Sequence, residues 1–110
     1  MRYLLLISAD EEAAEQSMAA GGFGDFPAWL ADLERRGVLE AHEGLHPSPT
    51  ATTVRVRDGE VLLTDGPFAE GREQVGGFAL VNCRDLDEAI EIAAGHPASR
   101  IGQVEIRPVR

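Results

Sequence analysis

Apolar positions along the chain mark two strands that belong inside a sheet. Residues 2–8, RYLLLIS, form a short apolar run bounded by polar residues, a length typical of a buried strand and too short for a helix. In Gly77–Cys83, apolar side chains occupy both sets of alternating positions. A strand that is apolar on both faces predicts a central place in the sheet, with material packed on each side.

Four further stretches alternate more or less regularly between apolar and polar residues, as strands with one buried face do. Val38–Leu45 alternates loosely and runs into a proline-rich loop. Thr52–Arg57 and Glu60–Thr64 flank Asp58-Gly59, a pair that favours a tight hairpin turn. Gln103–Val109 is the last predicted strand.

Capping residues and helical spacing predict three helices. Asp10 is the expected N-cap of a helix over Glu11–Ala20, and Asp25 that of a helix over Phe26–Arg36. Whether residues 21–25, GGFGD, form a loop or only a kink between them stays open. Asp85 begins a third helix, which ends at Gly95 and whose expected inward stripe is Leu86, Ala89, Ile90, Ala93 and Ala94.

The order of these elements predicts an α+β fold, a ferredoxin-like βαββαβ arrangement with an extra hairpin. Helices in this arrangement cover one face of the sheet. Because the strand over Gly77–Cys83 is apolar on both faces, the uncovered face needs a partner, and a second copy of the chain is the simplest one. We therefore predict a homodimer whose sheets pack face to face.

Composition narrows the class of protein. A chain of 110 residues suits a single domain over residues 1–110, and its net charge of −9 disfavours direct binding to nucleic acid or to an anionic membrane. The lone Cys83 excludes an internal disulfide and fits a reducing compartment. The apolar run Tyr3–Ile7 is shorter than a signal-peptide core, so we expect a cytoplasmic protein.

Several motifs resemble the YCII-related, DGPF-type family across nearly the whole chain. The most specific is TDGPFAE at residues 64–70, and the others include MRYLLLI at 1–7, DLDEA at 85–89 and GQVEIRPV at 102–109. The resemblance implies a ferredoxin-like fold of the dimeric α+β barrel group. It also implies two kinds of function: some relatives resemble lyases acting on substituted aromatic rings, and others are associated with extracytoplasmic-function sigma factors.

The lyase-like relatives use a histidine on the first helix and an aspartate before a proline near the last strand. This chain departs from that pattern, because Phe26–Arg36 contains no histidine and His96 stands before Pro97 where the aspartate would be. Their His-Asp mechanism therefore cannot be carried over.

Asp65 and His96 are the candidate catalytic residues, each with a structural alternative. Asp65 precedes Gly66-Pro67 and either caps a sharp turn or acts as a general base at the mouth of a pocket. His96 either donates to the last carbonyls of a helix and is held protonated by its dipole, or transfers protons near neutral pH. The catalytic interpretation requires both side chains to face one pocket.

Other candidates concern binding. Phe68 would roof the pocket, while Arg55, Arg72 and Arg107 either clamp an anionic substrate or pair with the surplus of acidic residues. The aromatic residues Tyr3, Phe26 and Trp29 are expected in the core, with the alternative that one lines an aromatic-binding pocket.

No metal or cofactor is expected. His42 and His46 have only Glu43 nearby as a further possible ligand and lack a third obligate one, and no nucleotide-binding fingerprint occurs. Two hypotheses remain. One is a small-molecule protein, such as an enzyme of the lyase or isomerase type, with its pocket beside the dimer seam. The other is a non-catalytic module that binds a protein such as a sigma factor.

Overall fold

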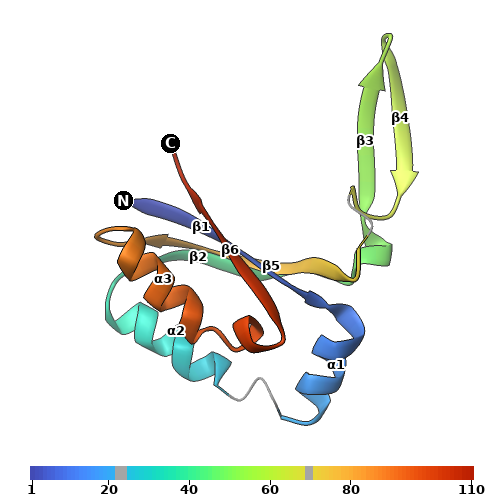
Figure 1. The fold of residues 1–110 in the computed structure, drawn as a ribbon. Helices are drawn as coiled ribbons and strands as arrows, with labels where there is room; N and C mark the ends of the chain where they lie inside the picture. The colour runs from blue at the N-terminus through green and yellow to red at the C-terminus, as the bar shows by residue number, and fades with distance from the viewer. Residues whose placement is uncertain (22–24, 69–70) are drawn as a thin grey trace.

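A four-stranded antiparallel sheet organises the molecule. The computed structural model describes residues 1–21, 25–68 and 71–110. The sheet order is β2-β5-β1-β6, so the first and third strands of the ferredoxin-like plan lie in the centre (Figure 1). Its strands are β1 (Arg2–Asp10), β2 (Leu39–Gly44), β5 (Glu73–Asn82) and β6 (Gly102–Pro108).

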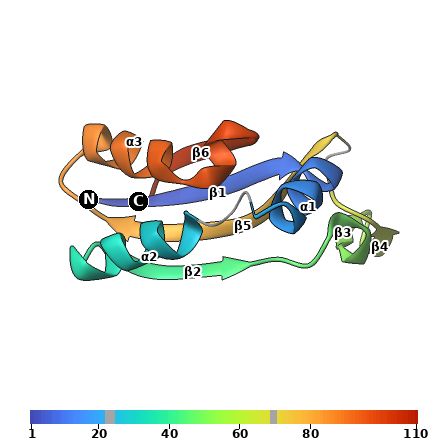
Figure 2. The same cartoon turned by 90° about the horizontal axis from the view of Figure 1, so that it is seen from below.

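Helices cover one face of this sheet and leave the other open (Figures 1 and 2). They are α1 (Glu11–Ala19), α2 (Phe26–Arg35) and α3 (Leu86–Gly95), with short 3-10 turns η1 (Ser48–Thr50) and η2 (Pro97–Arg100). Within the described ranges, no helix has the length and apolar character needed to cross a membrane.

The predicted hairpin forms a separate two-stranded sheet. Its strands are β3 (Thr52–Arg57) and β4 (Glu60–Asp65), joined by Asp58 and Gly59 with φ of 52° and 78°. Positive φ at both central residues is the geometry that an Asp-Gly turn favours. The hairpin rises on the side of the main sheet away from the helices (Figure 1).

The core lies between the sheet and the helices. Tyr3 and Leu5 of β1 pair with Val81 and Ala79 of β5, and all four side chains are buried. The opposite helix face contributes Trp29, Leu33, Ala89 and Ile92. The intervening residues of the same strands project toward the open face, as strand alternation requires.

The expected α+β ferredoxin-like fold with an extra hairpin is confirmed, but the predicted inward stripe of α3 is partly wrong. Leu86 and Ile90 are each 49% exposed, and the buried residues are Ala89, Ile92 and Ala93. Small alanines beside Ile92 let α3 lie close to the sheet, so the contact face is narrower than the apolar pattern suggested.

Two of the three predicted helix caps are confirmed. Asp10 accepts from the Ala13 amide at 3.1 Å, and Asp85 accepts from the Glu88 amide at 2.9 Å. Asp25 instead has helical backbone angles and makes no capping hydrogen bond through its side chain, so that prediction was wrong. The loop-or-kink question over GGFGD concerns residues 22–24, which lie outside the described residues.

Candidate functional site

A pocket of about 360 Å³ opens between α2 and the part of the sheet where β2 pairs with β5. Its volume falls in the range of small-molecule sites, which are mostly apolar with a few polar groups. The described residues that line it are Ile7, Met18, Phe26, Pro27, Trp29, His42, Glu43, Gly44, Gly76, Gly77, Phe78, Ala79 and His96.

Backbone forms part of the pocket wall where β5 passes β2. An added Cβ at Gly77 would lie 2.9 Å from the carbonyl oxygen of Glu43, so no side chain fits there without a shift of the strands. Next to it, Gly76 lies at the register shift between Ile7 and Ser8 of β1. The two glycines keep this wall free of side chains and leave room for a ligand.

Trp29 and Phe26 of α2 form the aromatic wall. The indole Nε1 of Trp29 donates to the carbonyl of Ile92 at 2.8 Å, which ties α2 to α3 and sets the ring's orientation. The edge-on contact between Trp29 and His96 has a centroid distance of 4.7 Å, and Phe26 lies 5.5 Å from His96. Phe26 and Trp29 also stack on each other at 6.0 Å, so the imidazole of His96 packs edge-on against a pair of aromatic rings.

His96 is buried, with 4% of its surface exposed, directly after α3. Its Nδ1 accepts a hydrogen bond from the Ala98 amide at 2.9 Å and so caps η2. Burial lowers the pKa of His96 to about 4. The expectation that the helix dipole keeps it protonated was wrong, because the loss of hydration outweighs the dipole in this apolar setting.

His42 enters the same pocket from β2. It pairs with Ala79, which is fully buried on the helix-covered side, and its ring centroid lies 6.5 Å from that of Phe26. Glu43 also borders the pocket, but strand alternation directs its side chain to the opposite face. Sequence reasoning considered His42 only as a metal ligand, because its face is known only once the pairing of β2 with β5 is known.

His42 and His46 do not share a strand face. Strand β2 ends at Gly44, and His46 is exposed in the loop beyond it. Among the described residues, no three His, Cys, Asp or Glu side chains are placed to hold a metal ion together.

The structure does not bring Asp65 and His96 together within one chain. Asp65 ends β4, is exposed, and is absent from the pocket lining. Hydrogen bonds at this turn come from Gly66, whose amide donates to Ala51 at 2.7 Å and whose carbonyl accepts from Thr53 at 2.8 Å. In the part of the chain that the structure describes, the Asp65 carboxylate makes no hydrogen bond, so its catalytic role stays a prediction without support from this geometry.

Phe68 and Arg55 contact each other near the base of the hairpin. The guanidinium carbon of Arg55 lies 5.7 Å from the centre of the Phe68 ring, and Phe68 is 79% exposed. Neither residue lines the pocket that contains His96. In the single chain, Phe68 is therefore not a roof for that pocket.

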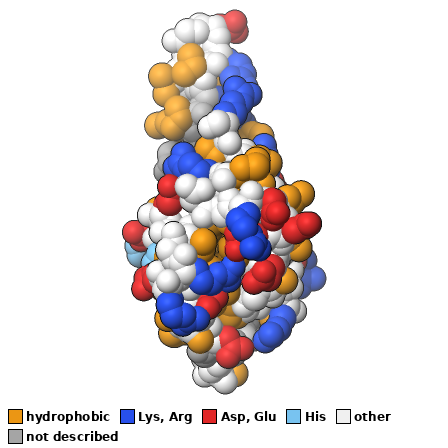
Figure 3. Space-filling model, turned by 90° about the vertical axis from the view of Figure 1, so that its left-hand side faces the viewer, with side chains coloured by type: hydrophobic (Ala, Val, Ile, Leu, Met, Phe, Trp, Pro, Cys, Tyr) orange, Lys and Arg blue, Asp and Glu red, His pale blue; other side chains and the backbone are white. Residues whose placement is uncertain are grey.

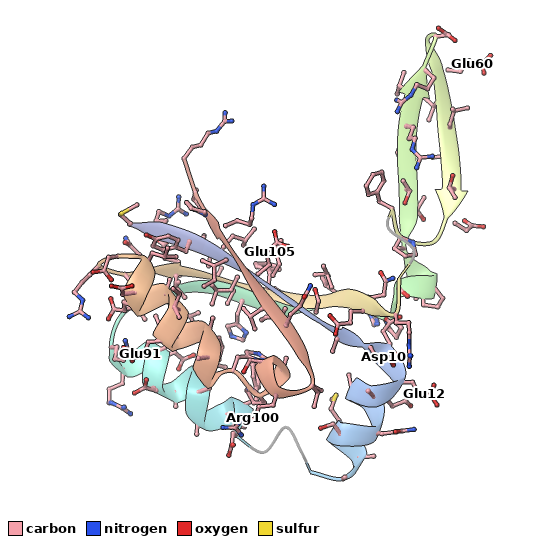
Figure 4. All side chains as sticks on the ribbon, viewed as in Figure 1. Asp10, Glu12, Glu60, Glu91, Arg100 and Glu105 are labelled. Atoms are coloured by element: carbon pink, nitrogen blue, oxygen red, sulfur yellow. The ribbon has the colours of Figure 1, made fainter. Side chains whose placement is uncertain are left out.

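Arg72 and Arg107 pair with acidic residues on separate elements. Arg72 contacts Asp10 at 3.2 Å, and Arg107 contacts Glu105 at 3.1 Å along β6. Figure 4 shows that the two acidic partners lie apart, Asp10 beside α1 and Glu105 on β6. These pairs agree with the structural alternative for the arginines. Among the described residues, none of the three pockets contains Arg55, Arg72 and Arg107 together, so these pockets hold no three-arginine clamp.

Comparisons with known proteins agree with this fold. A structure of 5-chloro-2-hydroxyhydroquinone dehydrochlorinase from Burkholderia phenoliruptrix, in complex with 2,5-dihydroxybenzoquinone, is similar with a TM-score of 0.55 and 13% identity, over 100% of this chain and 94% of that one. At this identity the similarity shows the fold alone.

An uncharacterised protein of Rhizobium meliloti is 42% identical over 69 residues, which are 59% of this chain and 54% of the relative. The chain thus spans about half the length of the curated relative that it matches. The model of the YCII-related domain matches residues 1–110. By this match over its full length, the chain belongs to the YCII-related family.

Proposed function

We propose that the pocket beside α2 binds a planar, mostly apolar small molecule and that the protein is an enzyme of the lyase or isomerase type. The observation that carries this proposal is that His42 and His96, from separate elements, both line one apolar pocket and both contact Phe26. An imidazole can exchange a proton with a ligand or donate a hydrogen bond from a neutral N–H, and an apolar surrounding strengthens such contacts.

The fold similarity suggests a ligand with which to begin. The neighbouring structure contains 2,5-dihydroxybenzoquinone, a flat ring with oxygen substituents. Such a ring suits a pocket of about 360 Å³ with Trp29 and Phe26 in one wall. Because α2 has no histidine and His96 precedes Pro97, the reaction would use a different pair of groups from the lyase-like relatives.

Calorimetric titration with 2,5-dihydroxybenzoquinone tests the pocket. We expect saturable binding to the wild-type chain and its loss in Gly76→Leu, since an added Cβ at Gly76 has no atom within 4 Å and the longer side chain would fill the pocket. Val75→Leu is the matched control, because exposed Val75 does not line this pocket. Equal binding by Gly76→Leu and wild type would place the ligand elsewhere, and no binding to wild type would remove support for this ligand class.

Turnover is tested separately with 5-chloro-2-hydroxyhydroquinone, by measuring released chloride. We expect the wild-type chain to release chloride and His42→Gln, which changes the side-chain volume little, to release none. If wild type binds the quinone but releases no chloride from this substrate, the proposed binding site is supported and the dehydrochlorinase-like reaction is contradicted.

The proposed functional unit is a homodimer. By strand alternation, Leu4, Leu6, Phe78 and Leu80 lie on the face opposite the buried core residues of the same two strands. The chain exposes 7452 Å², whereas a compact protein of 11.8 kDa exposes about 5,900 Å². Its radius of gyration of 15.6 Å also exceeds the value of about 13 Å for a compact domain of this length. A second copy packed on the open face would bury part of this excess surface.

A protein-binding module is the second candidate, and the hairpin is the feature that favours it. Strand alternation places Val54, Val56, Val61 and Leu63 on one face of the hairpin, each between 57% and 68% exposed. Hydrophobic side chains gather along one flank of the protruding hairpin and arginines along the other (Figure 3). In this alternative the partner is an extracytoplasmic-function sigma factor, and co-sedimentation with one from the same genome, lost in Val54→Thr/Leu63→Thr, would support it.

A further inference from the structure

The two ring nitrogens of His96 have different surroundings. The Ala98 amide donates to Nδ1 at 2.9 Å, so Nδ1 uses its lone pair as an acceptor and carries no proton. A neutral imidazole has one N–H, which must then be on Nε2. The hydrogen bond that caps η2 therefore also selects the tautomer.

The Nε2–H group faces the pocket. Within the described residues, Nε2 of His96 has no hydrogen-bond partner, yet no fully buried side-chain nitrogen or oxygen in those residues lacks one. Nε2 must therefore reach the accessible surface, although only 4% of the residue is exposed. The accessible space that His96 lines is the pocket beside Phe26 and Trp29.

This arrangement prevents His96 from acting as a base. Its only nitrogen lone pair is engaged by Ala98, and protonation of Nδ1 would break that hydrogen bond and leave a charge in a buried, mostly apolar place. A fixed, neutral N–H in an apolar pocket is instead suited to stabilise an oxygen atom as negative charge develops on it.

His42 differs from His96 in each of these respects. It is half-buried, and neither of its nitrogens bonds to another described residue. Both nitrogens are therefore free to exchange a proton with a ligand or with water. Its ring and that of His96 both contact Phe26, so one ligand of the pocket's size can reach the two imidazoles.

We propose a division of roles in which Nε2–H of His96 donates a hydrogen bond to a ligand oxygen and His42 accepts a proton from the same ligand. This inference rests on the proposed function. It specifies the ligand as a planar enol, phenol or conjugated ketone, because the oxygen must be conjugated with the reacting atom. His42 removes a proton, and the electron pair left behind is delocalised onto the oxygen held by His96.

The reaction then ends in one of two ways. In an isomerisation, His42 returns the proton to a different atom of the ligand. In an elimination from a hydroxylated ring, His42 returns the proton to the ring carbon that bears the leaving group. Loss of a second hydroxyl proton to water then expels the leaving group as an anion, so the ligand loses one acid molecule overall. Neither route needs a redox partner, since no atom changes its oxidation state through the protein.

Long-range ¹H–¹⁵N spectra of the imidazole rings test the tautomer without any ligand. We expect His96 to be neutral with its proton on Nε2 at pH 7, and to stay so at pH 5.5. Assignment comes from the spectrum of His96→Asn, in which its signals vanish. A protonated ring at pH 7, or a proton on Nδ1, would overturn the role of His96 whether or not a ligand binds.

Matched variants then separate the two roles. His96→Asn keeps a favourable capping acceptor but loses the N–H that reaches the pocket, so we expect binding of 2,5-dihydroxybenzoquinone to weaken about tenfold or more. His42→Gln should bind this quinone with an affinity within about threefold of wild type but release no chloride from 5-chloro-2-hydroxyhydroquinone.

Unchanged binding by His96→Asn, or wild-type turnover by His42→Gln, contradicts the division of roles. Absence of binding to wild type would overturn the proposed function instead, while the spectra still decide the state of His96.

Discussion

At the scale of single residues, surroundings decide what each histidine does. His96 is neutral because burial against Phe26 and Trp29 removes its water and the Ala98 amide occupies its acceptor. His46, four positions beyond His42, is exposed and outside the pocket. Three residues of one type thus have three different chemical environments within a small protein.

The buried state of His96 predicts a loss of stability in mild acid. Its folded pKa of about 4 lies below the ordinary value of 6.5, so the unfolded chain takes up the proton first as the pH falls. The free energy of unfolding should therefore keep this contribution above pH 6.5 and lose it between pH 6.5 and 4, by at most about 3 kcal/mol. Urea denaturation across this range measures it.

His96→Asn is the comparison for that experiment. The variant lacks the titrating group but retains the carboxylates of Asp10 and Glu88, whose pKa values are lowered chiefly by hydrogen bonds from the Ala13 and Arg84 amides. Its stability should fall less steeply than that of wild type between pH 6.5 and 4. Parallel curves for the two proteins would show that burial of His96 does not produce the effect.

Trp29→Phe should destabilise the protein by removing one hydrogen bond and part of the core volume that the indole fills. The indole donates to Ile92 in a buried place, so its removal leaves that carbonyl unpaired at a cost of about 1–3 kcal/mol. Tyr3→Phe is the control, because among the described residues the Tyr3 hydroxyl donates to the sulfur of Met1 alone, at 3.6 Å. Equal midpoints of denaturation for Trp29→Phe and wild type would contradict this assignment.

At the scale of elements, local signals explain where strands and helices begin, and packing explains which faces they bury. The helix α3 begins after Asp85 because its carboxylate accepts from the Glu88 amide, while Glu88 accepts from the Arg84 amide at 2.9 Å. Its buried face could not be read from the apolar pattern, which included Leu86 and Ile90. Those residues are half-exposed because α3 contacts the sheet through Ala89, Ile92 and Ala93.

Removing the cap of α3 tests this local signal. We expect Asp85→Ala to lower the free energy of unfolding by about 1 kcal/mol, measured by urea denaturation. Asp87→Ala, in the same first turn but without the capping bond, should cost only a few tenths of a kcal/mol through the helix dipole. An equal loss in both variants would indicate that charge, and not capping, stabilises this end.

At the scale of the whole molecule, the open sheet face and the projecting hairpin are the features that one chain leaves without partners. The hairpin stands on the same side as the open face, opposite the helices (Figure 1). An isolated two-stranded hairpin is only marginally stable in water, so contact with a second chain would stabilise it. Both features support the proposed homodimer.

Sedimentation equilibrium measures the proposed dimer. Wild type should have about twice the mass of the 11.8 kDa chain at micromolar concentration. Leu6→Arg places a charge on the open face and should give a monomer, whereas Ile90→Arg on the outer side of α3 should stay dimeric. Thermal melts of each variant separate loss of dimer from loss of fold. A wild-type monomer at these concentrations would contradict the proposal.

Sequence alone determined the order of the elements, the tight turn at Asp58-Gly59 and the caps at Asp10 and Asp85. These features depend on residues within a few positions of one another, so the pattern contains the physical information that they need. The same holds for the chain reversal at Gly66 and Pro67, which follows the end of β4 at Asp65 and leads toward β5.

Only the tertiary structure decided the site. It joined His42 of β2 to His96 after α3, and it left Asp65 exposed at the end of β4. The pocket exists because α2 packs across the β2–β5 edge, and the charge of His96 follows from desolvation by residues about seventy positions away in the chain. Both effects are non-local, so no spacing of residues in the sequence could reveal them.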